Sequence, residues 1–88
     1  MKNRTTTDMA AAVLESARRP IKKTQLMFRT NIYIRQLNAV LKRLQDKGLI
    51  QFDDKTRTFL TTERGREFLE LYKSMTDDVH FISQPMNE

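Results

Sequence analysis

The sequence of 88 residues contains no cysteine and no tryptophan, and it has only two glycines, two prolines and one histidine. Without cysteine the chain can form neither a disulfide nor a thiolate metal site, so we expect packing to stabilise it. The two glycines, Gly48 and Gly65, do not form a glycine-rich phosphate loop. His80 has no cysteine partner, and a zinc ion there would need carboxylates or a second subunit. We therefore expect no metal and no cofactor.

The adjacent carboxylates Asp53 and Asp54 raise the question of a metal site or of acid/base chemistry. Neighbouring side chains of a strand point to opposite faces, and aspartate is a common turn residue, so we favour a turn. The sequence offers no convincing base, nucleophile or metal cluster. We expect that the protein is not an enzyme.

The chain also lacks a long apolar run. No segment reaches the ~18 to 20 apolar residues of a membrane-spanning helix. The stretch from Met9 to Leu14 is too short and too rich in alanine for a signal sequence, and Asp8 and Glu15 argue against a mitochondrial presequence. We expect a cytoplasmic protein with no membrane partner.

Positive charge is concentrated in the middle of the chain, within a formal net charge of +5. Eight cations and no acid lie between positions 18 and 43, whereas residues 74–88 contain three acids and no cation. Such a segment is typical of a nucleic-acid-binding face. The alternative is an ordinary solvated surface, although that usually interleaves both signs. The eight cations are Arg18, Arg19, Lys22, Lys23, Arg29, Arg35, Lys42 and Arg43.

Hydrophobic periodicity predicts two helices in the first third of the chain. The first covers residues 9–18, with Asp8 as its N-cap, and Pro20 ends it. The second is short and covers residues 22–29. Asn31 then suits a tight turn or the cap of the next helix. The side chains expected to face inward from the second helix are Leu26, Met27 and Phe28.

A longer helix is predicted over residues 33–47, and Gly48 is its expected left-handed C-terminal cap. Its apolar residues form a stripe about 120° wide, which indicates a helix packed on a core. After Gly48 the apolar period changes to two, and residues 49–52 and 57–60 are predicted to form a hairpin with a turn at 53–56. The apolar stripe consists of Ile34, Leu37, Val40, Leu41 and Leu44.

A fourth helix is predicted to begin at Thr61 or Thr62, either of which suits an N-cap. It ends near Thr76 or continues to about Ile82. Its apolar side consists of Phe68, Leu69, Tyr72 and Met75.

The order of elements predicts an α+β, mainly helical fold of three helices, a two-stranded wing and a C-terminal helix. The second and third helices form a helix-turn-helix unit, and the hairpin is the wing. We divide the chain into a flexible N-terminus (1–7), a winged helix-turn-helix domain (8–73) and a C-terminal extension (74–88).

Several motifs occur in order along the chain: Lys23-Thr24, Asn31, Gln36-Leu37, "L..L..KGLI" from Leu41 to Ile50, and "LTTERGREFL" from Leu60 to Leu69. With these motifs, residues 8–73 resemble archaeal winged helix-turn-helix transcriptional regulators and related small dimeric archaeal chromatin-type proteins. The resemblance implies a dimer. We expect it to bind double-stranded DNA as a transcriptional regulator or chromatin-associated protein, with a nucleoid-associated location in the cytoplasm. Such sequences often have serine at the N-caps of the second and third helices, where this chain has Lys22 and Tyr33.

In a helix-turn-helix unit the second helix enters the major groove and its N-terminal part reads base edges, so residues 33–47 are the expected recognition helix. Arginine suits guanine, Gln or Asn suits adenine, and a small apolar residue suits the thymine methyl. The predicted base readers are Arg35, Gln36, Ala39 and Asn38. The predicted phosphate contacts are Lys22, Lys23, Thr24, Tyr33, Lys42 and Arg43, and the predicted wing contacts are Lys55 and Arg57. Arg35 and Lys42 have a plainer alternative as solvated residues and Gln36 as a neutral helix former, and Tyr33 equally suits packing on the second helix.

The C-terminal region has more apolar residues than a lone winged domain needs to bury. We expect a homodimer through Leu71, Met75, Val79, Phe81 and Ile82. The alternative to DNA binding is a winged-helix interaction module that docks on an acidic protein, since a basic face suits that partner too.

Overall fold

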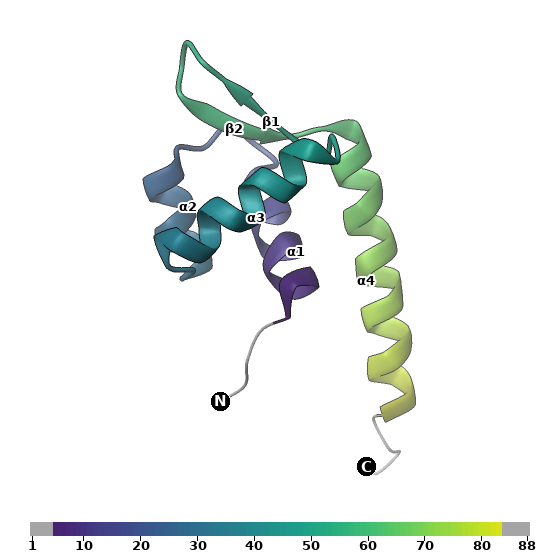
Figure 1. Cartoon of the computed structure of the whole chain (residues 1–88). Helices are drawn as coiled ribbons and strands as arrows, with labels where there is room; N and C mark the ends of the chain where they lie inside the picture. The colour runs from purple at the N-terminus through teal and green to yellow at the C-terminus, as the bar shows by residue number, and fades with distance from the viewer. Residues whose placement is uncertain (1–4, 84–88) are drawn as a thin grey trace.

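The computed structural model describes residues 5–83, with side chains described up to residue 75. Three helices, α1 (Thr6–Ser16), α2 (Lys23–Thr30) and α3 (Ile34–Asp46), precede a hairpin of β1 (Ile50–Asp53) and β2 (Thr58–Thr61), and α4 (Glu63–Ser83) follows. In Figure 1, α3 crosses in front of α1, the hairpin lies at the top, and α4 descends along one side. The predicted fold class is therefore confirmed. No helix within residues 5–83 is long and apolar enough to cross a membrane.

The hydrophobic core draws on all four helices. Leu14 of α1, Leu26 of α2, Leu37 of α3 and Leu69 of α4 are all almost completely buried. Burial of each such side chain contributes roughly 1.5 to 3 kcal/mol before entropy is counted. The core therefore holds α3, the predicted recognition helix, by its buried face.

The N-cap of α1 differs from the prediction. The hydroxyl oxygen of Thr5 accepts a hydrogen bond from Asp8 N at 3.0 Å, and the Asp8 carboxylate accepts one from Thr5 N at 3.4 Å. This reciprocal capping box starts the helix at Thr6, so the expected start at residue 9 with Asp8 as N-cap is wrong. Asp8 also accepts a 2.6 Å hydrogen bond from the Tyr72 hydroxyl, which joins the start of α1 to α4.

Two residues predicted to lie in the core are on the surface. Phe28 is 84% exposed and Ile34 is 44% exposed, whereas Ile32 is buried. Ile34 lies at the edge of the apolar stripe of α3, about 70° from its centre at 100° per residue. Ile32 instead follows Asn31, which ends α2 in the left-handed conformation at φ 58°. The other four residues of the predicted α3 stripe are buried, as expected.

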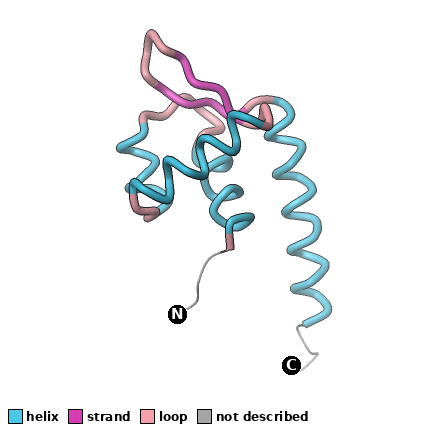
Figure 2. Tube along the Cα trace, viewed as in Figure 1, coloured by secondary structure: helices cyan, strands magenta, loops and turns pink. Residues whose placement is uncertain are grey.

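The hairpin pairs Ile50 with Thr61 and Asp53 with Thr58 in antiparallel register. Both strands begin one position later than predicted, at residues 50 and 58. Ile21 forms an isolated bridge with Phe59 through two backbone hydrogen bonds of 2.8 and 3.1 Å. The chain just before α2 is therefore tied to the wing, whose loop lies at the far end of the hairpin from the helices (Figure 2).

Thr62, and not Thr61, caps α4. Its hydroxyl accepts a 3.1 Å hydrogen bond from Gly65 N and donates one of 2.7 Å to the carbonyl oxygen of Gly48. Gly48 has φ 74°, as predicted for the cap after α3. A Cβ at Gly65 would overlap the carbonyl oxygen of Leu49, so α4 approaches the hairpin more closely than any side chain allows. From this start α4 runs to Ser83, the longer of the two predicted lengths.

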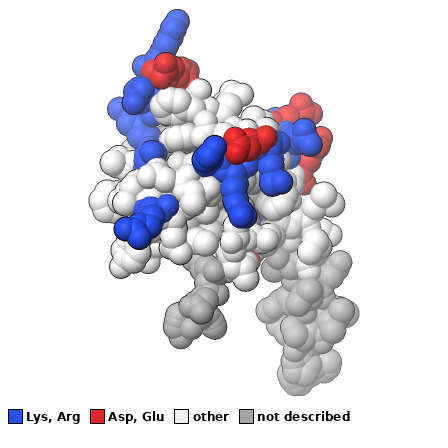
Figure 3. Space-filling model, in the orientation of Figure 1, with Lys and Arg blue, Asp and Glu red and all other residues white. Residues whose placement is uncertain are grey.

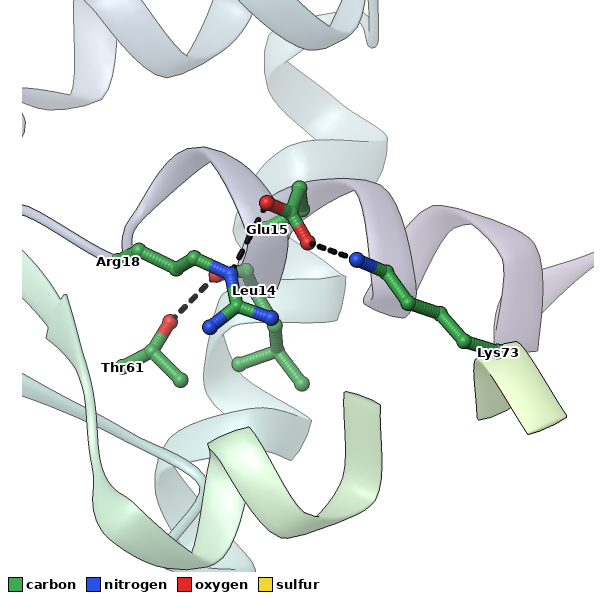
Figure 4. Close-up of polar contacts among 5 residues, drawn as sticks. All are labelled: Leu14, Glu15, Arg18, Thr61 and Lys73. Carbon is green, nitrogen blue, oxygen red and sulfur yellow. Dashed lines mark hydrogen bonds and ion pairs between the residues drawn. The ribbon is translucent and has the colours of Figure 1, made fainter. Parts of the chain in front are cut away.

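Thr61 instead forms a buried polar contact between the hairpin and α1. Its hydroxyl donates to the Leu14 carbonyl oxygen at 2.7 Å (Figure 4). One residue further along α1, the Glu15 carboxylate accepts a 2.9 Å hydrogen bond from Arg18 Nε. It also forms an ion pair with Lys73 Nζ at 3.3 Å. Partial burial raises the pKa of Glu15, but the contacts with Arg18 and Lys73 outweigh it and leave that pKa below its ordinary value.

Candidate nucleic-acid interface

The side of α3 opposite the core carries polar, cationic and small side chains. At 100° per residue, Arg35, Ala39 and Lys42 lie within about 30° of the direction opposite the buried stripe. Gln36 and Asn38 lie on the two flanks, and all five are exposed. Figure 3 shows Lys and Arg side chains over α3, along the hairpin and on the α2 side of this face. The four predicted base readers are therefore all exposed, with Arg35 and Ala39 on the outward side and Gln36 and Asn38 on opposite flanks.

Asn38 and Lys23 contact each other, which the sequence did not predict. Lys23 Nζ donates a 2.8 Å hydrogen bond to Asn38 Oδ1. The contact joins the first residue of α2 to the flank of α3. A residue predicted to hold phosphate and a residue predicted to read a base are thus one polar unit.

The start of α2 presents free backbone N–H groups and two lysines. Lys22 is the N-cap, as expected, and its side chain makes no capping hydrogen bond because an ammonium has no acceptor. Its backbone N–H donates to Gln25 Oε1 at 3.1 Å. Lys22, Lys23 and Thr24 are exposed, so an anion can approach this end of the helix.

The two cations in the second half of α3 differ in their surroundings. Lys42 Nζ lies 3.6 Å from an Asp46 carboxylate oxygen, one turn further along the helix. Arg43 has no ion pair with any side chain described between residues 5 and 75. Exposed pairs of this kind contribute at most about 1 kcal/mol, so a phosphate can displace Asp46 from Lys42.

The two predicted wing contacts also differ. Arg57 lies at φ 60°, donates to Asp54 Oδ1 at 3.2 Å and has its guanidinium carbon 5.4 Å from the centre of the Phe52 ring. Lys55 is exposed in the turn, where its backbone N–H donates to Asp53 Oδ1 at 2.9 Å. The turn role of Asp53 is therefore confirmed, and Lys55 is the less constrained of the two wing cations.

The wing and the start of α2 form one open hollow, although their contacts with DNA were predicted separately. The β-bridge between Ile21 and Phe59 brings them together. The hollow also contains Gln45, which was not predicted as a site residue and whose role no local sequence pattern indicates. The lining residues are Lys22, Lys23, Thr24, Gln45, Phe52, Arg57 and Phe59.

Tyr33, the N-cap of α3, is 82% exposed. It therefore does not pack against α2, which was the alternative to a phosphate contact. Its hydroxyl lies at the end of the helix predicted to enter the groove.

The predicted dimer residues lie on α4, and the two whose side chains are described are exposed. Leu71 is 67% exposed and Met75 is 64% exposed. Val79, Phe81 and Ile82 belong to the same helix, but their side chains lie outside the described residues. Within the described part of the chain, no three His, Cys, Asp or Glu residues are grouped as metal ligands.

A family model described as winged helix-turn-helix matches residues 3–79 of the chain. Among solved structures, the chain is similar to a transcriptional regulator of the MarR family from Silicibacter pomeroyi, with 23% sequence identity and a TM-score of 0.66. The similarity covers 94% of this chain and 60% of that regulator, so this chain spans less than two thirds of the regulator's length. At this identity the likeness shows a common fold. No curated protein matches the chain.

Proposed function

Because the chain belongs to the winged helix-turn-helix family, we propose that it binds double-stranded DNA as a transcriptional regulator or chromatin-associated protein. The supporting observation is the exposed face of α3, where Arg35, Ala39 and Lys42 point away from the core. The second helix of such a unit lies in the major groove with its N-terminal part at the base edges. The archaeal and chromatin-type relationship implied by the sequence remains a prediction, as does a nucleoid location.

We assign base contacts to the first half of α3. Arg35 suits a bidentate contact with guanine, Gln36 a contact with adenine, and Ala39 a contact with a thymine methyl. Asn38 suits adenine from the flank that faces α2, with its amide held by Lys23. These four residues give the interface its sequence preference in this proposal.

Phosphate contacts surround that region. Lys22, Lys23 and Thr24 meet the backbone on one side, and Lys42 and Arg43 meet it one or two turns further along α3. Tyr33 contributes its hydroxyl, and Lys55 and Arg57 extend the contact to the wing. Their common role is affinity without sequence preference.

We also propose a homodimer through α4. Leu71 and Met75 are exposed apolar side chains on a helix that continues past the core, and exposed apolar groups of this kind favour a protein partner. Val79, Phe81 and Ile82 continue the apolar sequence. A second copy would place two recognition helices on one DNA molecule.

The test of DNA binding is a mobility shift with random-sequence duplex over a range of salt concentrations. If about six phosphates are neutralised, the slope of log K against log salt is near −5. Substitution of Lys22 with Gln makes that slope shallower by about one unit for every sequence. Substitution of Arg35 and Gln36 with Ala changes the preferred sequence. A flat salt response would reject the proposal, and binding to an acidic protein without binding to DNA would favour the interaction module.

A further inference from the structure

Ile34 occupies the first turn of α3 without a role in the core. It is 44% exposed, while Ile32 and Leu37 on either side of it are buried. A β-branched residue also has a lower helix propensity than alanine. Somewhat less than half of the Ile34 side chain is therefore available to contact a ligand.

The neighbours of Ile34 are those of a DNA-reading surface. Arg35 follows it, and Asn38 lies one turn along the same flank, since side chains four residues apart in a helix are neighbours. Asn38 in turn holds the ammonium group of Lys23. Arg35 and Lys23 suit a negatively charged ligand, and Ile34 beside them suits an apolar group on that ligand. DNA carries both, in its phosphates and in its thymine methyl groups.

We propose that Ile34 contacts the 5-methyl group of thymine, so that the flank formed by Ile34 and Asn38 selects A·T pairs. The thymine methyl is the apolar group of the major-groove edge, and adenine offers the donor and acceptor pair that asparagine matches. This inference rests on the proposed function. It adds a base reader and a sequence class, since the protein then prefers duplexes with thymine opposite the first turn of α3.

The size of the effect follows from the burial of one methyl group. Burial of one CH₂-sized group changes affinity about fourfold. The same methyl can be removed from DNA without changing any hydrogen bond, because uracil lacks only that group. It can also be added to a G·C pair, because 5-methylcytosine carries a methyl at the same ring position.

The experiment compares the dissociation constants of alternating duplexes of A with T and A with U, and of G with C and G with 5-methylcytosine. All are measured at one salt concentration. We expect the methylated duplex of each pair to bind about fourfold more tightly. Equal affinity within both pairs would overturn the inference and leave DNA binding intact. Failure to bind any duplex, even at low salt, would instead overturn the proposed function.

Ile34→Ala assigns the preference to this residue. Alanine favours the helix and the position is partly exposed, so the variant keeps its fold by circular dichroism. We expect the ratio between the methylated and unmethylated duplexes to fall below fourfold, to the share contributed by Ala39. Phe28→Ala is the matched control, because Phe28 is also exposed and apolar but lies on α2. An unchanged ratio in Ile34→Ala, or an equal loss in Phe28→Ala, would contradict the assignment to Ile34.

Discussion

Lys23 Nζ donates a 2.8 Å hydrogen bond to Asn38 Oδ1, which makes a lysine of α2 part of the surface of α3. The amide oxygen has two acceptor positions, so Asn38 can bind adenine while Lys23 fixes the orientation of its amide. We predict that Lys23→Met and Asn38→Ala have non-additive effects on DNA affinity, with a coupling of at least about 0.5 kcal/mol.

Dissociation constants from the four proteins of this double-mutant cycle give the coupling directly. Lys22→Met is the control in place of Lys23→Met, because Lys22 makes no contact with Asn38 among the described hydrogen bonds. Strictly additive effects would mean that Lys23 and Asn38 act independently, with Lys23 only contacting phosphate as the sequence predicted.

Leu37 and Ile34 stand one turn apart on α3 and should differ sharply in their contribution to stability. Leu37→Ala removes a fully buried side chain and should lower the free energy of unfolding by about 2 to 5 kcal/mol. Ile34→Ala should change it by less than about 1 kcal/mol because the side chain is partly exposed and alanine favours the helix. Urea denaturation measures both, and equal losses would mean that Ile34 belongs to the core.

The Thr61 hydroxyl should stabilise the fold although it belongs to a surface hairpin. Thr61→Val keeps the shape but leaves the Leu14 carbonyl oxygen without that donor in a buried place, at a cost of about 1 to 3 kcal/mol. Thr58→Val on the same strand is the control, since its hydroxyl bonds Thr56 at the surface. The free energies of unfolding of the two variants should therefore differ, and similar values would contradict a specific role for Thr61.

Glu15 should make stability depend on pH in the acid range. Its pKa in the folded protein lies below the ordinary value of 4.5, so its contribution is complete above that pH and is lost as pH falls through the folded pKa. Because the side chain is 48% exposed, Glu15→Gln should cost less than about 1 kcal/mol at neutral pH. Thermal unfolding from pH 7 to pH 2 tests the sign: the difference between the two proteins should shrink toward low pH.

The exposed face of α4 should control the association state. Leu71→Glu with Met75→Glu should convert a dimer to a monomer in sedimentation, because two charges would be buried in the proposed interface. Removal of residues 74–88 should have the same effect. Phe28→Glu introduces a charge at another exposed apolar position and should leave the mass unchanged. Equal masses for all of these proteins would remove the proposed dimer.

The features predicted well from the sequence are those that depend on periodicity or on one residue type. Leu37, Val40, Leu41 and Leu44 are buried because a stripe of apolar residues can face only one core. Gly48 adopts the positive φ that its position after the helix indicated. The apolar stripe and the glycine turn each depend on residues close together in the sequence. The helix, the turn after it and the wing could therefore be predicted in the correct order.

The errors arose where local signals competed or where contacts span the chain. Thr5 and Asp8 both suit an N-cap, and only their mutual hydrogen bonds decide between them. Ile34 was expected in the core but lies at the edge of the apolar stripe, whereas Ile32, just after the left-handed Asn31, is buried. Contacts such as Lys23 with Asn38 depend on how two helices cross, which no spacing in the sequence encodes. The assignment of individual base and phosphate contacts remains a prediction.

Gly65 approaches the Leu49 carbonyl oxygen so closely that the junction between the wing and α4 has no room for a side chain at this position. Thr62 joins the carbonyl of Gly48 to the first turn of α4, and the missing side chain of Gly65 lets backbone rest on backbone there. The junction between the wing and α4 therefore depends on the absence of a side chain at position 65 and on the hydroxyl of Thr62. A change of exposed side chains further along α4 would therefore leave this junction in place.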